Sequence, residues 1–166
     1  MGDLVDLYLI RHSDAVPLGE NGITEDAERP LTKVGEEHAR RAAQALQKKG
    51  VTLDRLVTSP LLRAKQTAEQ MLRAWQGAAP EVHECDDLAP DGKMRKLGRF
   101  LLKLGGERIG LVGHLPHIAT LLGWLIGNKK TQVDMAKAGI AYVALGSSPR
   151  KGLGTLQWLV TPEWFE

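Results

Sequence analysis

The sequence predicts an α/β fold, arranged as a single-domain three-layer α/β/α sandwich around a mostly parallel central sheet. Segments with strand patterning alternate with segments of helical periodicity along the chain, which favours a parallel sheet covered by helices on both faces. The length of 166 residues fits one domain, since domains typically span about 100–200 residues. No repeat, linker or low-complexity tract interrupts it, so one domain over residues 1–166 is expected.

The chain opens with a predicted strand, Leu4–Ile10, in which apolar and polar residues alternate. The next stretch, Ser13–Pro30, contains proline, glycine and five carboxylates, and is predicted to be a loop long enough to be functional. Thr32 can cap a helix that runs to about Lys49 and stops at Gly50. The apolar side expected for this helix consists of Val34, Ala39, Ala42, Ala43 and Leu46.

A short strand, Leu53–Thr58, is expected to lead into a second helix. Ser59 offers a hydroxyl for the N-cap and Pro60 suits the first helical position, which is typical of a helix start. Apolar residues then recur at helical spacing. The expected buried face consists of Leu61, Ala64, Ala68, Met71, Leu72 and Trp75.

The second half of the chain continues the alternation. The predicted strands are Glu81–Cys85, Ile109–Gly113, Ile140–Leu145 and Thr155–Val160. The predicted helices are Lys93–Leu104 and Pro116–Ile126, the latter stopped by Gly127.

Composition excludes several classes of protein. The formal charge is only +2, which is too small for the basic field of a nucleic-acid-binding protein. No run approaches the ~18 apolar residues of a membrane span, and Asp3 and Asp6 near the start do not suit a secretory signal. Cys85 is the single cysteine, so no internal disulfide can form. These features predict a cytoplasmic protein, and nothing in the pattern points beyond a monomer.

Histidines and arginines follow three of the predicted strands. Arg11 and His12 come after the first strand, Arg63 after the second, and His114 after Ile109–Gly113. Ligands of open α/β sheets bind beyond the carboxyl ends of the strands, so these side chains are expected to meet at one edge. One imidazole nucleophile among several cations suits a phosphoryl group.

Each of these residues also has an interpretation without function. Arg63 falls in the first helical turn, where the macrodipole disfavours a cation by roughly 0.3–1 kcal/mol unless an anion sits there too. The same side chain could simply reach solvent. His12 alone could be a half-buried histidine bonded to a neighbouring loop. The pair His114 and His117 could suggest a metal site, but no further ligand is obvious, so no metal is expected.

Other nucleophiles and cofactor motifs are not supported. Cysteine phosphatases require an arginine six residues after the cysteine, whereas that position holds Asp91, so Cys85 is predicted to be a core residue at a strand end. The chain has neither a Walker loop nor a dinucleotide fingerprint, and no cofactor is expected.

Taken together, the motifs LIRHSDA, RPLTKVGEEHA, VTSPLLRAKQTAE and LVGHLPHI resemble the histidine phosphatase superfamily. The short length and the tail QWLVTPEWF are similar to its small SixA-type phosphohistidine phosphatase branch. The resemblance implies a phosphoglycerate mutase-like fold, His12 as the nucleophile, and Arg11, Arg63 and a protonated His114 as groups that hold phosphate.

Two positions depart from the pattern of the family. Glycine often follows the Arg-His pair, whereas this chain has Ser13, whose hydroxyl could add a contact to phosphate or simply be tolerated. Larger relatives carry a glutamate as general acid, and the corresponding stretch here is DDLAPDG. Asp91 or Asp87 could replace it, although the general acid is left unassigned, because the SixA-type branch is understood to lack one.

The resemblance therefore implies a metal-independent phosphatase that acts through a phosphohistidine on His12. The expected substrate is a phosphohistidine on a protein, such as a phosphorelay histidine domain, or a labile phosphomonoester. Two alternatives stay open: a non-catalytic regulator that binds phosphohistidine, and a small-molecule phosphomonoesterase or mutase of the same superfamily. Neither nucleic acid nor a membrane is expected as a partner.

Overall fold

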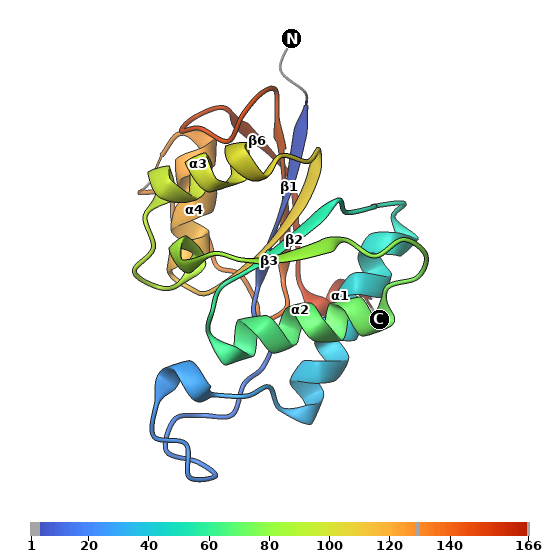
Figure 1. Cartoon of the computed structure of the whole chain (residues 1–166), viewed down its shortest axis with the longest axis vertical. Coiled ribbons are helices and arrows are strands. Elements are labelled where there is room, and N and C mark those ends of the chain that lie inside the picture. Colours follow the sequence, from blue (N-terminus) through green and yellow to red (C-terminus); the bar gives the residue numbers. More distant parts are fainter. Residues whose placement is uncertain (1–3, 129, 166) are drawn as a thin grey trace.

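A six-stranded sheet forms the middle layer of the molecule in the computed structural model, which describes residues 4–128 and 130–165 (Figure 1). Its strand order is β3-β2-β4-β1-β5-β6. The strands are β1 (Val5–Arg11), β2 (Arg55–Thr58), β3 (Glu81–Glu84), β4 (Arg108–Gly113), β5 (Ile140–Leu145) and β6 (Gly154–Val160). Strands β1 to β4 pair in parallel, and β5 and β6 are added antiparallel. The predicted α/β class and mostly parallel sheet are confirmed.

Two pairs of helices cover the two faces of the sheet. The helices are α1 (Lys33–Lys48), α2 (Leu62–Ala74), α3 (Met94–Leu104) and α4 (His117–Ile126). Helices α1 and α2 share one core cluster with the sheet, and α3 and α4 share the other, which gives the predicted three layers. Short 3-10 turns, η1 (Asp26–Glu28), η2 (Asp86–Leu88) and η3 (Pro162–Phe165), complete the elements.

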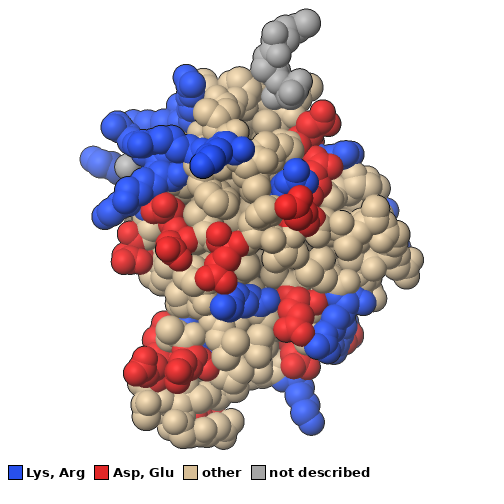
Figure 2. Space-filling view, in the orientation of Figure 1, with Lys and Arg blue, Asp and Glu red and all other residues tan. Residues whose placement is uncertain are grey.

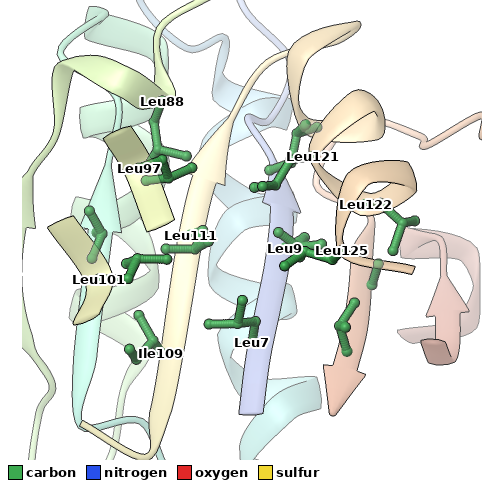
Figure 3. Close-up of a cluster of buried hydrophobic side chains, with 14 of the residues drawn as sticks. Leu7, Leu9, Leu88, Leu97, Leu101, Ile109, Leu111, Leu121, Leu122 and Leu125 are labelled. Carbon is green, nitrogen blue, oxygen red and sulfur yellow. The ribbon is translucent and has the colours of Figure 1, made fainter. Parts of the chain in front are cut away.

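The alternation in β1 explains why the sheet needs a helical layer on each side. Leu7 and Leu9 pack with α3 and α4, as Figure 3 shows for that core, whereas Tyr8 and Ile10 face the cluster that contains α1 and α2. All four side chains are buried. Successive side chains of a strand point to opposite faces, so the apolar run Leu7–Ile10 must be covered on both faces.

Local signals set most of the helix ends where the sequence predicts them. Thr32 caps α1, because its hydroxyl accepts a hydrogen bond from the Gly35 N–H at 3.0 Å. Gly127 ends α4 in the left-handed conformation, with φ of 107°. Val34 is an exception, since it is 58% exposed and does not belong to the apolar side of α1.

The predicted start of the second helix is wrong by two residues. Helix α2 begins at Leu62, after an extended Leu61, so Ser59 and Pro60 do not occupy the N-cap and first helical positions. The Ser59 hydroxyl accepts a hydrogen bond from the Leu61 N–H and also forms one with the ring of His114. Ser59 follows directly on β2 and is fully buried.

Asp3 lies outside the described residues. Among the helices that the structure describes, none is both long and apolar enough to pass through a membrane.

Candidate active site

Three strand ends bring the predicted residues to one edge of the sheet. In the register of the parallel strands, Arg11 at the end of β1 lies opposite Gly113 at the end of β4. Thr58, the last residue of β2, lies opposite Val112 in β4. His12 and His114 follow directly on β1 and β4, so the carboxyl ends of three strands meet around them.

His12 is held with one ring nitrogen available for chemistry. Its side chain is buried, and its Nδ1–H donates to the backbone carbonyl of Ser13 at 2.7 Å. Because a carbonyl can only accept, the proton lies on Nδ1 and Nε2 keeps its lone pair. The Arg63 Nε–H points at this Nε2 across 3.3 Å. A backbone carbonyl therefore anchors the ring nitrogen that does not face Arg63.

The surroundings of His12 keep its ring neutral. Burial is the main reason that its pKa falls from the usual range to about 4, since a buried imidazolium loses its hydration. The positive charges of Arg63, Arg11 and Arg29 lower this pKa further, whereas the hydrogen bond to Ser13 opposes the shift.

Arg63 occupies the first turn of α2, as predicted, and its side chain is only 6% exposed. Its guanidinium does not reach solvent freely, because it donates to the backbone carbonyl of Asp26 at 2.7 Å and to the Asp26 carboxylate at 3.0 Å. The interpretation of Arg63 as a solvent-exposed residue is therefore wrong. These bonds fix the guanidinium beside the His12 ring.

Arg11 is the last residue of β1, and the chain segment between α4 and β5 holds its guanidinium. One terminal N–H of its guanidinium donates to the Met135 carbonyl at 2.7 Å. Its Nε is buried and has no hydrogen-bond partner among the described residues. The Arg11 charge is close enough to lower the pKa of His12.

His114 lies beside His12, with ring centroids 5.1 Å apart. Its Nε2 and the Ser59 hydroxyl form a hydrogen bond of 2.7 Å, and the residue is 1% exposed. Burial, followed by the fields of His12 and Arg63, lowers the pKa of His114 to about 3. In the ligand-free protein this ring is therefore neutral, and the protonated His114 expected beside a bound phosphate stays a prediction.

Ser13 does not provide the phosphate contact considered from the sequence. It is fully buried, and its hydroxyl donates to the Gly35 carbonyl at 2.7 Å in the first turn of α1. Its N–H donates to the Thr67 hydroxyl of α2 at 3.0 Å. Ser13 therefore ties the backbone after His12 to the two helices on that face.

Neither carboxylate considered as a general acid joins the site. Asp87 accepts a hydrogen bond from the Lys93 N–H at 2.9 Å and so supports the start of α3, and Asp91 is exposed. Within the described residues, neither forms a hydrogen bond or ion pair with His12 or His114.

Sequence reasoning missed two charged residues, Asp26 and Arg29. The Asp26 carboxylate bridges Arg63 and Arg29, each at 3.0 Å, and Arg29 also donates to the Val16 carbonyl. The sequence contains one signal for this pair, because the opposite charges of Asp26 and Arg29 stand three residues apart in EDAERPLT. Its meaning depends on the loop folding back onto α2, which no local pattern specifies.

The structure offers little support for other chemistry at this edge. Within residues 4–128 and 130–165, no three histidine, cysteine or acidic side chains are grouped so that they could hold a metal ion. The His117 Nε2 lies 3.1 Å from the Gly92 carbonyl. Cys85 is buried directly after β3, as predicted, and burial raises the pKa of its thiol.

Comparisons with known proteins point to one family. The family model of the histidine phosphatase superfamily (branch 1) matches residues 7–89. An uncharacterized protein of Picosynechococcus sp. is 34% identical over 96% of this chain and 98% of its own length. Phosphohistidine phosphatase SixA of Escherichia coli is 29% identical over 95% of this chain and 94% of its own. A structure of SixA complexed with tungstate superimposes with a TM-score of 0.84 at 27% identity, covering 98% of this chain and all of that one.

Proposed function

The chain belongs to the histidine phosphatase superfamily, and we propose that it is a phosphatase that acts through a phosphohistidine formed on His12. The orientation of the His12 ring carries this proposal. Its Nδ1–H is fixed by the Ser13 carbonyl, while the Nε2 lone pair faces the Arg63 guanidinium. A neutral, oriented imidazole beside a buried cation is suited to attack phosphorus in an anion that the cation holds.

In the first step, His12 Nε2 attacks the phosphorus in line with the leaving group. The P–N bond forms as the bond to the leaving group breaks, and the leaving group departs with the electron pair. Water then attacks the phosphohistidine, the P–N bond breaks, and orthophosphate leaves as the imidazole regains its lone pair. The Nδ1 proton stays on the ring throughout, held by the Ser13 carbonyl at 2.7 Å.

The cations of the site stabilise the charge on the transferring phosphoryl group. Arg63 and Arg11 would donate to its equatorial oxygens, where the negative charge is spread. His114 is neutral in the free protein, with a pKa of about 3, and a neutral imidazole still carries one N–H that it could donate to a phosphate oxygen. The phosphate charge itself raises the pKa of this ring and favours that role. No step needs a metal ion, and a chelator such as EDTA should leave turnover unchanged.

The proposed substrate is a phosphohistidine on a protein, such as a phosphorelay histidine domain. The similarity to phosphohistidine phosphatase SixA over most of both chains supports this choice. The bonding of these carboxylates also supports it, because among the described residues neither Asp87 nor Asp91 bonds His12 or His114. An imidazole leaves more readily than an alkoxide, so it needs less help from a general acid.

Trapping of the enzyme intermediate tests the role of His12. The protein would be mixed with a ³²P-labelled aryl phosphate and quenched in alkali, which preserves phosphohistidine. We expect turnover in the wild type and label on His12, and neither in His12→Ala. Phosphate binding without turnover or label would instead identify a non-catalytic phosphohistidine-binding regulator.

Competition between substrates tests the substrate class. A phosphorylated histidine domain should be hydrolysed with a much higher kcat/KM than phosphoserine or 3-phosphoglycerate. A mutase would transfer label from a bisphosphoglycerate donor to a monophosphoglycerate, and such transfer would overturn the assignment to phosphoprotein. Preference for a small phosphomonoester, without transfer, would leave the phosphatase chemistry intact and reject only the protein substrate.

A further inference from the structure

A hollow of about 340 Å³ lies between α3 and the turn that joins β5 to β6, far from the candidate active site. Leu145 at the end of β5 pairs with Val5 at the start of β1, whereas His12 follows the end of β1. The hollow therefore lies at the opposite edge of the sheet, near the top of the view in Figure 1. We call it the α3 hollow; its lining includes Arg95, Arg99, Leu102, Pro149, Arg150 and Lys151.

The arginines of the α3 hollow are unpaired. Arg95, Arg99 and Arg150 form no side-chain hydrogen bond or ion pair with any residue that the structure describes. Every other arginine of the chain donates to a carboxylate, amide or carbonyl oxygen: Arg11, Arg29, Arg40, Arg41, Arg55, Arg63, Arg73 and Arg108. The unpaired arginines are thus gathered around one cavity, although nothing in the sequence spacing requires it.

Helix α3 itself contributes only positive charge to this part of the surface. Helix α3 has the sequence MRKLGRFLLKL, which contains no acidic residue, and Arg95 lies in its first turn, where the macrodipole disfavours a cation. The whole chain carries a formal charge of only +2, so the concentration of positive charge is local. Figure 2 shows lysine and arginine side chains gathered over the part of the surface where α3 lies in Figure 1.

Apolar residues, among them Leu102 and Pro149, also line the α3 hollow. Leu102 is 57% exposed, although it is a large hydrophobic residue. At Gly98, an added Cβ would lie 2.9 Å from the Pro149 carbonyl oxygen, so the turn packs directly against the helix backbone. A volume of about 340 Å³ is at the lower end of the range for small-molecule sites.

We propose that the α3 hollow binds a small ligand that carries two or more linked phosphate groups. Several guanidinium groups around one cavity suit several anionic groups, because each planar fork can bind a phosphate through two parallel hydrogen bonds. Leu102 and Pro149 provide an apolar surface for an organic part, where the ligand carries one. The ligand chemistry has two sources, a nucleoside oligophosphate and a free oligophosphate, which ATP and tripolyphosphate represent.

Binding should be measured in a protein whose candidate active site cannot hold phosphate. Calorimetric titration of His12→Ala/Arg63→Ala with ATP, tripolyphosphate, AMP and orthophosphate meets this need. We expect ATP and tripolyphosphate to bind about tenfold or more tightly than the single-phosphate ligands, since the hollow holds several cations. Tighter binding of ATP than of tripolyphosphate assigns the apolar surface to the organic group, and equal binding assigns the affinity to the phosphates alone.

A matched pair of variants locates the binding. In the same background, Arg99→Gln/Arg150→Gln should weaken ATP binding about tenfold or more, whereas Arg73→Gln/Lys33→Gln, which removes equal charge elsewhere, should change it less than about twofold. In the otherwise wild-type chain, Arg99→Gln/Arg150→Gln should hydrolyse an aryl phosphate at the normal rate, which shows that this variant folds.

Equal losses of ATP affinity in both pairs of variants, or no binding at 1 mM ligand, would overturn the proposal. Binding of an acidic peptide without binding of ATP or tripolyphosphate would reassign the surface to a protein partner.

Discussion

Arg63 shows how one residue can be unfavourable for its helix and still be fixed there. A cation in the first turn of α2 opposes the macrodipole, and burial adds to the cost. The Asp26 carboxylate at 3.0 Å offsets part of this cost, and a bound phosphate would offset more. The arrangement has a clear use only if an anion arrives beside the His12 ring.

Removal of Arg63 should therefore affect chemistry more than folding. Arg63→Ala should lower kcat/KM for an aryl phosphate about 10²–10³-fold, the loss typical for one donor to a transition-state oxyanion. Steady-state kinetics would measure it. Arg73→Ala is the control, because Arg73 lies on the same helix but is exposed and pairs with Glu69. Similar losses in the two variants would contradict a direct role for Arg63.

The ionisation of His12 gives a second prediction at this scale. Burial and the neighbouring arginines lower its pKa to about 4, so the ring stays neutral and able to attack through the whole physiological range. NMR titration of histidine-labelled, ligand-free protein should show the Nδ1–H tautomer persisting to about pH 4–5. A midpoint near the ordinary histidine value, about 6.5, would contradict the proposed environment of the nucleophile.

Substitution of Ser13 distinguishes a structural role of its hydroxyl from a role as a phosphate ligand. Ser13→Ala removes the hydroxyl that donates to the buried Gly35 carbonyl, which should lower the free energy of unfolding by about 1–3 kcal/mol. The affinity for tungstate should stay within about threefold of wild type, because the hydroxyl does not face the site. Urea unfolding and a tungstate titration would measure the two effects. A large loss of tungstate affinity with unchanged stability would restore Ser13 as a phosphate ligand.

At the scale of elements, the first turn of α1 supports the nucleophile from behind. A Cβ at Gly35 would lie 2.0 Å from the Asp14 carbonyl oxygen, so helix α1 contacts the backbone two residues after His12. Only glycine allows this approach, and the Ser13 hydroxyl uses it to reach the Gly35 carbonyl. The helix and the strand end therefore form one rigid unit.

Gly35→Ala should push the first turn of α1 away from the backbone that follows His12. We expect the free energy of unfolding to fall by about 1–3 kcal/mol, as for an overpacked core, and kcat to fall as well because the His12 ring moves. Val34→Ala, one residue earlier, should be nearly neutral, since Val34 is 58% exposed. Unfolding curves and aryl phosphate hydrolysis on both variants provide the measurement. Wild-type activity in Gly35→Ala would show that the contact does not position His12.

Element boundaries also show where prediction from sequence succeeds and where it fails. The strands were predicted to within about two residues, because alternation and breaker residues are local signals. The start of α2 was misplaced because Ser59 bonds His114, a residue 55 positions away, and this contact overrides the local capping pattern. Similarly, Asp26 joins the site through a loop whose path depends on Arg63 of α2.

At the scale of the whole molecule, the sheet topology turns distant motifs into one site. The order β3-β2-β4-β1-β5-β6 places β4 between β2 and β1, so Ser59, His114 and His12 follow three adjacent strands. The class of fold and this shared edge were predictable, because the rule for the carboxyl ends of parallel strands is general. The neutral state of His114 was not predictable, because it depends on burial from all sides.

Two buried neutral histidines should make the whole fold sensitive to acid. The pKa values of His12 and His114 are lowered to about 4 and about 3, whereas unfolded histidine titrates near 6.5. Between pH 7 and pH 5 the unfolded chain therefore binds protons that the folded protein does not, and the free energy of unfolding falls as the pH falls. Each histidine should contribute a decrease of about 2 kcal/mol over this interval.

Urea unfolding at pH 7 and pH 5 measures this decrease, and the variant His12→Gln/His114→Gln should lose most of it. A double variant that keeps the full pH dependence would place the proton binding elsewhere in the molecule.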